Sequence, residues 1–389
     1  MSFILFVSAE FPPCGGGGVG RVSAIARHLA DTGHHVTVIT ASENNYSILD
    51  SSLLYEHPNL QVVRVYSPLI KTWQWRLKKI FPFINFDDNY ILWRAFAIKK
   101  AKKLHRKIPF DAVISSYPFV SNHAVAYAIV KAFSLPWCAD YRDPPWWMYS
   151  DTHKQQNQFF NYAKYATHNI VTTPNAKMLL SNKLSVANSD ISVVQNGCSP
   201  VAATMVLSKP VEFEFLHSGS FYEVGRDIND LIKAVDVFPN PIKLSFIGDA
   251  PYPSTKSLLT KMVHPERVSF TGYMSSTEVL TISAATYALV VIQGPLFTNQ
   301  VPGKVYEYLA LQKPILVITN KGSSTYQVLT KEPNVFFAEY GDVNSIQQAI
   351  VMILQHKAVD VDRNSYTRDK MVEQFSMVLH TNVFNINQS

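Results

Sequence analysis

The feature that most constrains the fold of this 389-residue chain is a repeated alternation of short apolar segments with longer segments of helical pattern. The short segments have the length of buried β-strands. Because helical patterns fill the intervals between them, the chain is expected to form parallel strands with crossover helices, as in a doubly wound α/β sheet. In the first half we expect strands at FILFVSA (3–9), HVTVIT (35–40), QVVRVY (61–66), DAVISS (111–116), PWCADY (136–141), NIVTTP (169–174) and ISVVQNG (191–197).

The alternation begins again after residue 198, which indicates a second α/β domain. A chain of this length is long for a single core, so two domains of similar size are expected. We predict domains at 1–198 and 199–389, with a terminal helix at about 366–384 that can pack on either domain. In the second domain we expect strands at FEFLHSG (213–219), IKLSFIGD (242–249), RVSFTG (267–272), YALVVI (287–292), PILVIT (314–319) and VFFAE (335–339).

Composition and cysteine usage favour a globular protein of a reducing compartment. Hydrophobic residues make up 47% of the chain and charged residues 16%, enough apolar surface for large cores. The three cysteines, Cys14, Cys138 and Cys198, are far apart and form no CxxC pair, so neither a disulfide framework nor a zinc site is indicated. We expect neither a signal peptide nor a transmembrane helix, and a cytoplasmic location.

A glycine-rich loop, Gly15–Gly18 followed by Gly20 and Arg21, separates the first expected strand from a helix. Loops at the carboxyl ends of strands bind ligands in open α/β sheets, and bare backbone lets a substrate approach closely. Gly15, Gly17 and Gly20 also fit the dinucleotide pattern G-x-G-x-x-G, with Glu43 as a possible ribose-binding acid. That fingerprint turns directly off the strand, whereas five residues with two prolines intervene here. A dehydrogenase and a flexible turn without a ligand are the alternatives to a substrate loop.

The segment FTNQVPGKVYEYLALQKPILVI (297–318) gives the stronger signal. Pro302 suits the first turn of a helix that ends before Pro314. Amides near Gly303 and Lys304, the Lys304 ammonium and the helix dipole would together hold a diphosphate without a metal. Glu307 lies one turn further on. Alone, Lys304 is a solvated cation and Glu307 an acid favoured by the dipole, but the combined spacing indicates a binding site.

The chain resembles the retaining family-4 glycosyltransferases of the GT-B fold over nearly its whole length. The resemblance implies two Rossmann-like domains that face each other across a cleft, an acceptor-binding domain at 1–198 and a donor-binding domain at 199–389. It also implies transfer of a sugar from a nucleotide-diphosphate sugar to a lipid-linked or cell-surface glycan, as in bacterial-type polysaccharide biosynthesis. The segments that carry it are FPPCGGGGVGRVSAIARHLADTGHHVTVIT (11–40), QNGCSP (195–200), FTGYMSSTEV (270–279) and PGKVYEYLALQKPILVIT (302–319).

In the donor domain, a Glu-x7-Glu pair of the family spans the helix after residue 302. Glu307 matches the second acid, which holds the donor ribose, and Asn299 stands in place of the first, which meets the transferred sugar. Arg226 is assigned to the diphosphate beside Lys304, although an exposed helix-capping arginine would fit as well. Tyr273 is expected either to stack on the nucleobase or to pack in the core.

In the acceptor domain, the resemblance places Gly17, Gly18 and Gly20 beside the cleft, next to the donor phosphate and the acceptor. His123 matches a family histidine near the donor sugar, and a structural helix cap is its alternative. Asp143 is chosen to orient the acceptor hydroxyl, and an Asp–Arg ion pair that holds the loop is its alternative. The acids of DYRD are three residues apart and do not suggest a metal site. No metal and no cofactor other than the nucleotide-sugar co-substrate are expected.

Retention is expected to proceed on one face of the sugar, with the leaving phosphate helping to deprotonate the acceptor. No pair of carboxylates at glycosidase spacing is then required. Two rivals use the same donor helix. A nucleotide-sugar epimerase would need no acceptor, and a non-catalytic nucleotide-sugar-binding protein would bind the donor without turnover.

Residues 71–107 combine eleven Lys or Arg with only two acids, and many aromatic residues stand among them. Basic and aromatic residues together suit an anionic lipid surface, which predicts peripheral association with the cytoplasmic face of a membrane. A solvated basic helix is the alternative. A nucleic-acid partner is not expected because no nucleic-acid-binding motif accompanies the basic residues.

Overall fold

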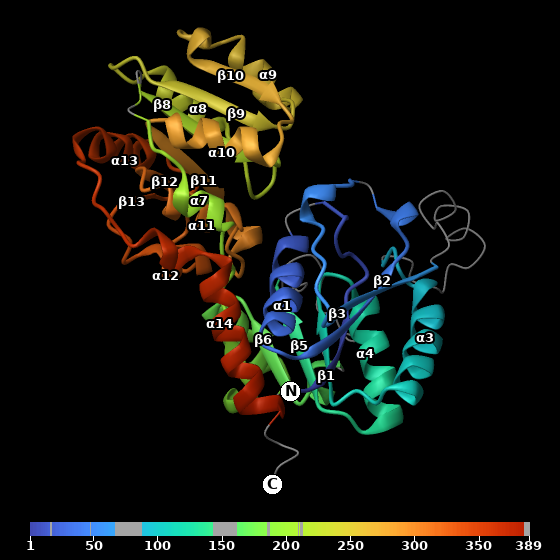
Figure 1. Ribbon diagram of the computed structural model, residues 1–389. Coiled ribbons are helices and arrows are strands. Elements are labelled where there is room, and N and C mark those ends of the chain that lie inside the picture. Colours follow the sequence, from blue (N-terminus) through green and yellow to red (C-terminus); the bar gives the residue numbers. More distant parts are fainter. Residues whose placement is uncertain are drawn as a thin grey trace. The chain divides into compact units, whose positions relative to one another are not determined.

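The computed structural model describes residues 1–15, 18–46, 48–66, 88–142, 162–184, 187–208, 210 and 213–384 (Figure 1). The chain divides into two units. The first combines Met1–Asn196 with Met371–Ser389, and the second is Gly197–Lys370. The division falls two residues before the expected boundary, and most of the terminal helix belongs to the first unit.

The first unit is built on a parallel sheet of seven described strands in the order β3-β2-β1-β4-β5-β6-β7. Phe6 lies opposite both Val38 and Ile114, so β1 is central. The strand order reverses between β1 and β4, which is the point where doubly wound sheets bind ligands. The strands are β1 (Phe3–Val7), β2 (His35–Ala41), β3 (Leu60–Val65), β4 (Ala112–Ser116), β5 (Trp137–Tyr141), β6 (His168–Val171) and β7 (Ile191–Val193).

Helices cover both faces of this sheet. Leu5 and Val7 of β1 belong to one core cluster, whereas Ile4 and Phe6 belong to another, as expected from the two-residue period of a strand. The second cluster includes Phe375 near the chain end, and Figure 1 shows α14 beside α1. The helices are α1 (Val19–Asp31), α3 (Trp93–Lys107), α4 (Val120–Phe133), α6 (Pro174–Leu184) and α14 (Arg368–Leu379), which continues as a π-helix over His380–Phe384.

The second unit repeats the plan with six described strands in the order β10-β9-β8-β11-β12-β13, all paired in parallel. The order reverses between β8 and β11. The strands are β8 (Glu214–Gly219), β9 (Lys243–Gly248), β10 (Val268–Gly272), β11 (Ala288–Gln293), β12 (Ile315–Thr319) and β13 (Val335–Ala338).

Helices also cover both faces of the second sheet. In β11, Leu289 and Val291 pack in one cluster and Val290 and Ile292 in another. The helix α10 begins with a capping box in which Ser275 and Glu278 bond each other's backbone N–H groups. The helices are α7 (Pro200–Thr204), α8 (Asn229–Asp236), α9 (Pro253–Leu259), α10 (Ser276–Ala285), α11 (Lys304–Ala310), α12 (Ser324–Leu329) and α13 (Val343–Gln355).

The prediction of two parallel, doubly wound sheets is confirmed, and every expected strand is present with ends that differ by a few residues. The helix α11 begins at Lys304, with Gly303 as its N-cap, so Pro302 lies just before the helix and not in its first turn. Within the described residues, no helix has the length and apolar character that crossing a membrane requires.

The basic stretch 71–107 is described only from residue 88 onward. There, α3 exposes Phe96 and several lysines, but Tyr90 and Trp93 are only 3% and 0% exposed. The prediction that these two aromatic residues accompany the basic charge at the surface is wrong. Trp93, Ala97 and Ala101 recur every four residues and form the buried face of α3, which places Trp93 in the core.

Candidate active site

In the second unit, Lys304 lies at the carboxyl ends of the two central strands, β8 and β11. Its Nζ donates to the carbonyl oxygen of Ser218 at 2.7 Å and lies 3.2 Å from Nδ1 of His217. His217 Nδ1 is in turn 3.1 Å from the carbonyl oxygen of Val290. Burial, together with the charge of Lys304, holds the pKa of His217 well below its ordinary value. A neutral imidazole therefore supports the ammonium group without repelling it.

Arg226 provides a second cation near Lys304. Its Nε donates to Gln293 Oε1 at 2.8 Å, and its guanidinium carbon lies 4.2 Å from the centre of the Phe297 ring. Arg226 is not a helix cap, because the N-cap of α8 is Ile228. Burial and the charge of Arg226 lower the pKa of Lys304, and no carboxylate among the described residues pairs with Lys304. An anion bound here would relieve this strain between like charges.

The first turn of α11 contributes backbone N–H donors and an acidic side chain to this site. A Cβ added at Gly303 would meet no atom within 4 Å, so packing inside the protein does not require glycine there. Glu307 is partly buried, and its carboxylate has no hydrogen-bond partner among the described residues. Burial raises the pKa of Glu307, and Arg368 opposes this shift. The carboxylate is therefore available to accept hydrogen bonds from a ligand.

The loop before α11 is held by the start of α12. The Ser324 N–H donates to the carbonyl oxygen of Thr298 at 2.7 Å, and Thr325 Oγ1 donates to that of Gln300 at 3.0 Å. Asn299 lies between these two anchors and is partly buried. The backbone around Asn299, which stands in place of the first family acid, is therefore held in position by α12.

Tyr273 follows β10 and is 81% exposed. This exposure excludes the alternative of core packing. An exposed aromatic face after the end of a strand is able to stack on a planar ring such as a nucleobase.

In the first unit, the glycine-rich loop makes room for an arginine. Gly18 is the N-cap of α1, and a Cβ added to it would lie 0.8 Å from Nη1 of Arg142. Any larger residue at position 18 would displace this guanidinium from its present position. Gly20 lies in the first turn of α1 and is partly buried. Gly17 and Asp143, two of the predicted site residues, lie outside the described residues.

The buried ion pair between Arg21 and Asp140 is a feature that the sequence did not predict. Nη2 of Arg21 donates to Oδ1 of Asp140 at 2.8 Å, and Nη1 donates to the carbonyl oxygen of Gln195 at 3.1 Å. The sequence signal was an arginine directly after the glycines and an acid inside an apolar strand. No sequence pattern indicated that Arg21 and Asp140, which are far apart in the chain, would pair.

His123 is buried on α4 and held by a hydrogen bond between its Nδ1 and Ser115 Oγ, 2.7 Å long. It is not a helix cap, because the N-cap of α4 is Phe119. Ser115 Oγ accepts from the indole N–H of Trp137 at 2.8 Å, so its own proton is available for Nδ1. Burial lowers the pKa of His123 to about 3. The ring is neutral at ordinary pH, and its Nε2 has no partner among the described residues.

Lys304 and Arg226 thus lie near the carboxyl ends of the central strands of the second sheet, whereas Tyr273 follows the edge strand β10. Among the described residues, no group of three or more His, Cys, Asp or Glu side chains could hold a metal ion.

Solved structures with the same fold cover almost the whole chain. The sucrose-phosphate synthase from Thermosynechococcus elongatus is 16% identical, with a TM-score of 0.69 over 98% of this chain and 99% of that one. The Anabaena protein HepE in complex with UDP and glucose is 15% identical, with a TM-score of 0.69 over 98% and 100%. The lipopolysaccharide outer core galactosyltransferase WaaB is 14% identical, with a TM-score of 0.68 over 98% and 99%. At these identities the likeness shows a shared GT-B fold.

Family models match most of the sequence. The model described as Glycosyltransferase Family 4 matches residues 15–200, and the model described as Glycosyl transferases group 1 matches residues 212–356. No curated protein matches the sequence significantly. The two matches follow each other along the chain, and both are glycosyltransferase models, which contradicts the dehydrogenase alternative. The chain therefore belongs to the GT-B glycosyltransferases of the group 1, family 4 type.

Proposed function

We propose that this glycosyltransferase moves a sugar, with retention of its anomeric configuration, from a nucleotide-diphosphate sugar to a lipid-linked or cell-surface glycan. The reaction would be a step of bacterial-type polysaccharide biosynthesis. The observation that carries the donor assignment is the pair of neighbouring cations, Lys304 and Arg226, at the carboxyl ends of β8 and β11. The similar Anabaena structure was solved with UDP and glucose, so UDP is the first nucleotide to test.

In this reaction, positive charge builds at the anomeric carbon while negative charge grows on the departing diphosphate. Lys304 and Arg226 would stabilise that negative charge from fixed positions, which is the kind of preorganised contact that lowers a barrier most. The leaving phosphate would take the proton of the acceptor hydroxyl on the same face of the sugar. This route needs no second carboxylate. Since the two cations already offset the diphosphate charge, we propose that transfer does not depend on a metal.

The remaining contacts divide between donor and acceptor. Glu307 would accept hydrogen bonds from the ribose hydroxyls, and Gly303 would let the diphosphate approach the backbone. His123 would donate its Nε2–H to the donor sugar, because Nδ1 is occupied by Ser115. The other proposed contacts are Asn299 to the donor sugar, Tyr273 to the nucleobase, Asp143 to the acceptor hydroxyl, and Gly17, Gly18 and Gly20 to the phosphate and acceptor.

We also propose that the enzyme works on the cytoplasmic face of a membrane, where a lipid-linked acceptor would be found. The support is the basic surface of α3, on which Lys99, Lys100, Lys103, Arg106 and Lys107 are exposed. Each such residue near an anionic surface contributes about 1 kcal/mol to binding.

Thermal unfolding with UDP tests the donor site without knowledge of the acceptor. A ligand at about 100 times its Kd stabilises a protein by about 2.7 kcal/mol, so UDP should raise the Tm of the wild type by several degrees. The Lys304→Ala variant should lose this shift. Lys261→Ala, which changes an exposed lysine between α9 and β10, is the matched control and should keep it.

The two alternative functions, an epimerase and a non-catalytic binding protein, predict different results with the same purified protein. Incubation with UDP-glucose alone should yield no isomerised nucleotide sugar, whereas an epimerase would produce one. Binding of UDP without transfer to any glycan acceptor would favour a non-catalytic binding protein. Absence of binding by every nucleoside diphosphate would overturn the proposed function altogether.

A further inference from the structure

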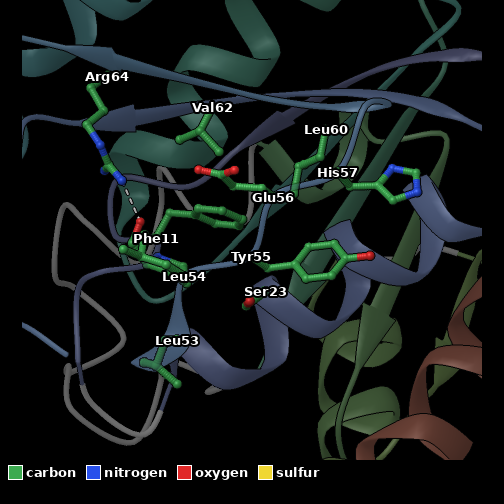
Figure 2. Close-up of a pocket in the computed structure, with 11 residues that line it drawn as sticks. Phe11, Ser23, Leu53, Leu54, Tyr55, Glu56, His57, Leu60, Val62 and Arg64 are labelled. Carbon is green, nitrogen blue, oxygen red and sulfur yellow. Dashed lines mark hydrogen bonds between the residues drawn. The ribbon is translucent and has the colours of Figure 1, made fainter. Parts of the chain in front are cut away.

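The first unit contains a pocket that the donor chemistry does not use. It has a volume of about 260 Å³ and lies between α1, the loop after β1 and β3, which is the outermost described strand of the sheet (Figure 2). Its lining is largely apolar. Leu60 and Val62 alternate along β3 and therefore share one face, and the buried ring of Phe11 joins them.

One wall of the pocket is held in place by α1. The Tyr55 hydroxyl donates to Asp31 Oδ1 at 2.6 Å, and the guanidinium carbon of Arg27 lies 4.1 Å from the centre of the Tyr55 ring. His57 Nε2 lies 3.7 Å from the same carboxylate. Asp31 and Arg27 both belong to α1, so these contacts fix the segment before β3 against that helix. The pocket is therefore formed in the absence of a ligand, as small-molecule sites usually are.

The cation of the pocket is already occupied. Arg64 Nε pairs with Glu43 Oε1 at 2.9 Å, and Nη2 donates to the carbonyl oxygen of Pro12 at 2.6 Å. The charge of Arg64 is thus balanced and its donors are engaged; the dashed line at Arg64 in Figure 2 marks the hydrogen bond of its Nη2. An anionic ligand such as a phosphate would find no open cation here.

Two polar groups of the lining remain open. The side chains of Ser23, on α1, and of Glu56, in the segment before β3, have no hydrogen-bond partner among the described residues. A carboxylate only accepts hydrogen bonds, and a serine hydroxyl accepts as well as donates. The ligand that these groups favour is neutral and rich in hydroxyl groups. A sugar ring has that chemistry, and its C–H face matches the apolar side of the pocket formed by Phe11 and Val62.

We infer that this pocket is a carbohydrate subsite that binds one neutral sugar ring of the acceptor glycan. The volume lies just below the usual range for ligand pockets, about 300–1,000 Å³, which suits one ring and not a longer oligosaccharide. The inference rests on the proposed function insofar as the ring belongs to the acceptor. The loop after β1 supports it, because Pro12 lines the pocket and the same loop leads to Gly18 at the start of α1.

Saturation-transfer NMR on the full chain tests the subsite with defined probes. The probes are the methyl glycosides of glucose, galactose, mannose and N-acetylglucosamine, with n-octanol as an aliphatic probe and UDP as the donor-site probe. Ring protons of at least one glycoside should receive saturation from the wild type. Glu56→Gln should weaken that binding by about tenfold, because it removes the charge from a hydrogen-bond acceptor, and Ser23→Ala should weaken it by a smaller factor, because its hydroxyl is neutral. Glu373→Gln, on the exposed side of α14, removes the same charge and should bind like the wild type.

The subsite is wrong if no glycoside binds, or if Glu56→Gln and Ser23→Ala both bind as well as the wild type. Binding of n-octanol that is lost in a variant with Val62→Trp, without binding of any glycoside, would reassign the pocket to an aliphatic chain. UDP separates the two proposals. Loss of glycoside binding with normal UDP binding overturns the subsite alone, whereas failure of UDP to bind contradicts the proposed function.

Discussion

The guanidinium of Arg21 and the carboxylate of Asp140 form a buried ion pair with 2.8 Å between Nη2 and Oδ1, and the two side chains are 4% and 0% exposed. Ser116 Oγ donates to the other carboxylate oxygen at 2.7 Å, and Arg21 Nη1 also donates to Asn196 Oδ1 at 3.1 Å. The pair thus joins the first turn of α1 to β4, to β5 and to the segment that leaves β7. It fixes the start of the helix that follows the glycine-rich loop.

Removing one partner of this pair should strongly destabilise the first unit. An uncompensated buried charge costs about 3–5 kcal/mol, so Arg21→Met and Asp140→Asn should each lower the free energy of unfolding by that order. The double variant Arg21→Met with Asp140→Leu should lose less than Arg21→Met alone, because neither charge is left buried. Urea unfolding of purified protein measures these differences.

Arg27→Ala is the control for the ion-pair variants. It removes an exposed arginine from the same helix, and its contact with the Tyr55 ring contributes about 0.5–1 kcal/mol. If Arg21→Met destabilises no more than Arg27→Ala, the buried pair does not have the role assigned to it.

Gly18→Ala should disturb the position of Arg142 more than the stability of the fold. The added methyl group would lie 0.8 Å from Arg142 Nη1, at the far end of a flexible side chain that is able to move away. Gly18 has φ −92°, a conformation that alanine adopts easily. We expect a loss of stability of about 1 kcal/mol or less, with a clear loss of sugar transfer.

A double-mutant cycle tests this interpretation. If Gly18→Ala acts by displacing Arg142, then adding it to Arg142→Ala should cause little further loss of transfer. Additive losses in the double variant would show that Gly18 has a separate role, such as close contact with a substrate.

The buried His123 should make the protein sensitive to acid. Burial lowers its pKa to about 3 in the folded state, whereas an unfolded chain binds the proton near pH 6.5. Below pH 6.5 the unfolded state therefore holds a proton that the folded state refuses, and stability falls by about 1.4 kcal/mol for each pH unit until pH 3. His123→Gln should reduce this slope between pH 6.5 and 4.5.

The measurement is urea unfolding at several pH values in that window. His264→Gln changes a partly exposed histidine of the second unit and serves as the control. An unchanged slope for His123→Gln would mean that His123 is protonated in the folded protein, and the assignment of Nε2–H as a neutral donor would then fail.

Much of the fold follows from sequence patterns because the deciding forces are local. The run YALVVI predicts a buried strand, and every residue of β11 is indeed buried. The restart of the pattern after residue 198 predicts the second sheet within two residues of the division between the units. The segment with Gly303, Lys304 and Glu307 predicts a helix, and α11 indeed begins at Lys304 with Gly303 as its N-cap.

The side-chain partners were not predictable, because they come from distant parts of the sequence. Lys304 is supported by His217, which stands in the strand segment FLHSG and gave no sign of this role. Trp93 looked like a surface aromatic residue among lysines, although the four-residue spacing with Ala97 places it in the core. Tertiary packing decides such cases, and a single sequence does not reveal which face of a basic helix is covered.

The exposed lysines of α3 should bind anionic membranes. In vesicle sedimentation at low salt, phosphatidylserine vesicles should carry down more protein than phosphatidylcholine vesicles, and added salt should reduce the difference by screening. Lys99→Glu with Lys103→Glu removes two attractive charges worth about 1 kcal/mol each, so binding should weaken by about thirtyfold or more.

Lys261→Glu, in the second unit, is the control for charge reversal away from α3 and should bind vesicles nearly as well as the wild type. Equal sedimentation with anionic and neutral vesicles would contradict the proposed membrane association. It would leave α3 as a solvated basic helix.

Lys304→Ala and Glu307→Ala should both impair sugar transfer, but in different kinetic parameters. Lys304 faces charge that grows on the diphosphate during the reaction, so its loss should lower kcat on the order of 100-fold to 1000-fold. Glu307 should hold a ribose that is bound equally in the ground and transition states. Its loss should raise the KM for the donor more than it lowers kcat.

Steady-state kinetics with UDP-glucose and a glycan acceptor, with Lys261→Ala as the folded control, separate these effects. Added Mg²⁺ or EDTA should change neither the wild type nor the variants much, because fixed cations and a helix N-terminus would offset the diphosphate charge. A strong dependence on Mg²⁺ would contradict the metal-independent mechanism. If Glu307→Ala keeps full activity and normal donor affinity, then α11 does not bind the nucleotide, and the assignments of Gly303 and Asn299 fail with it.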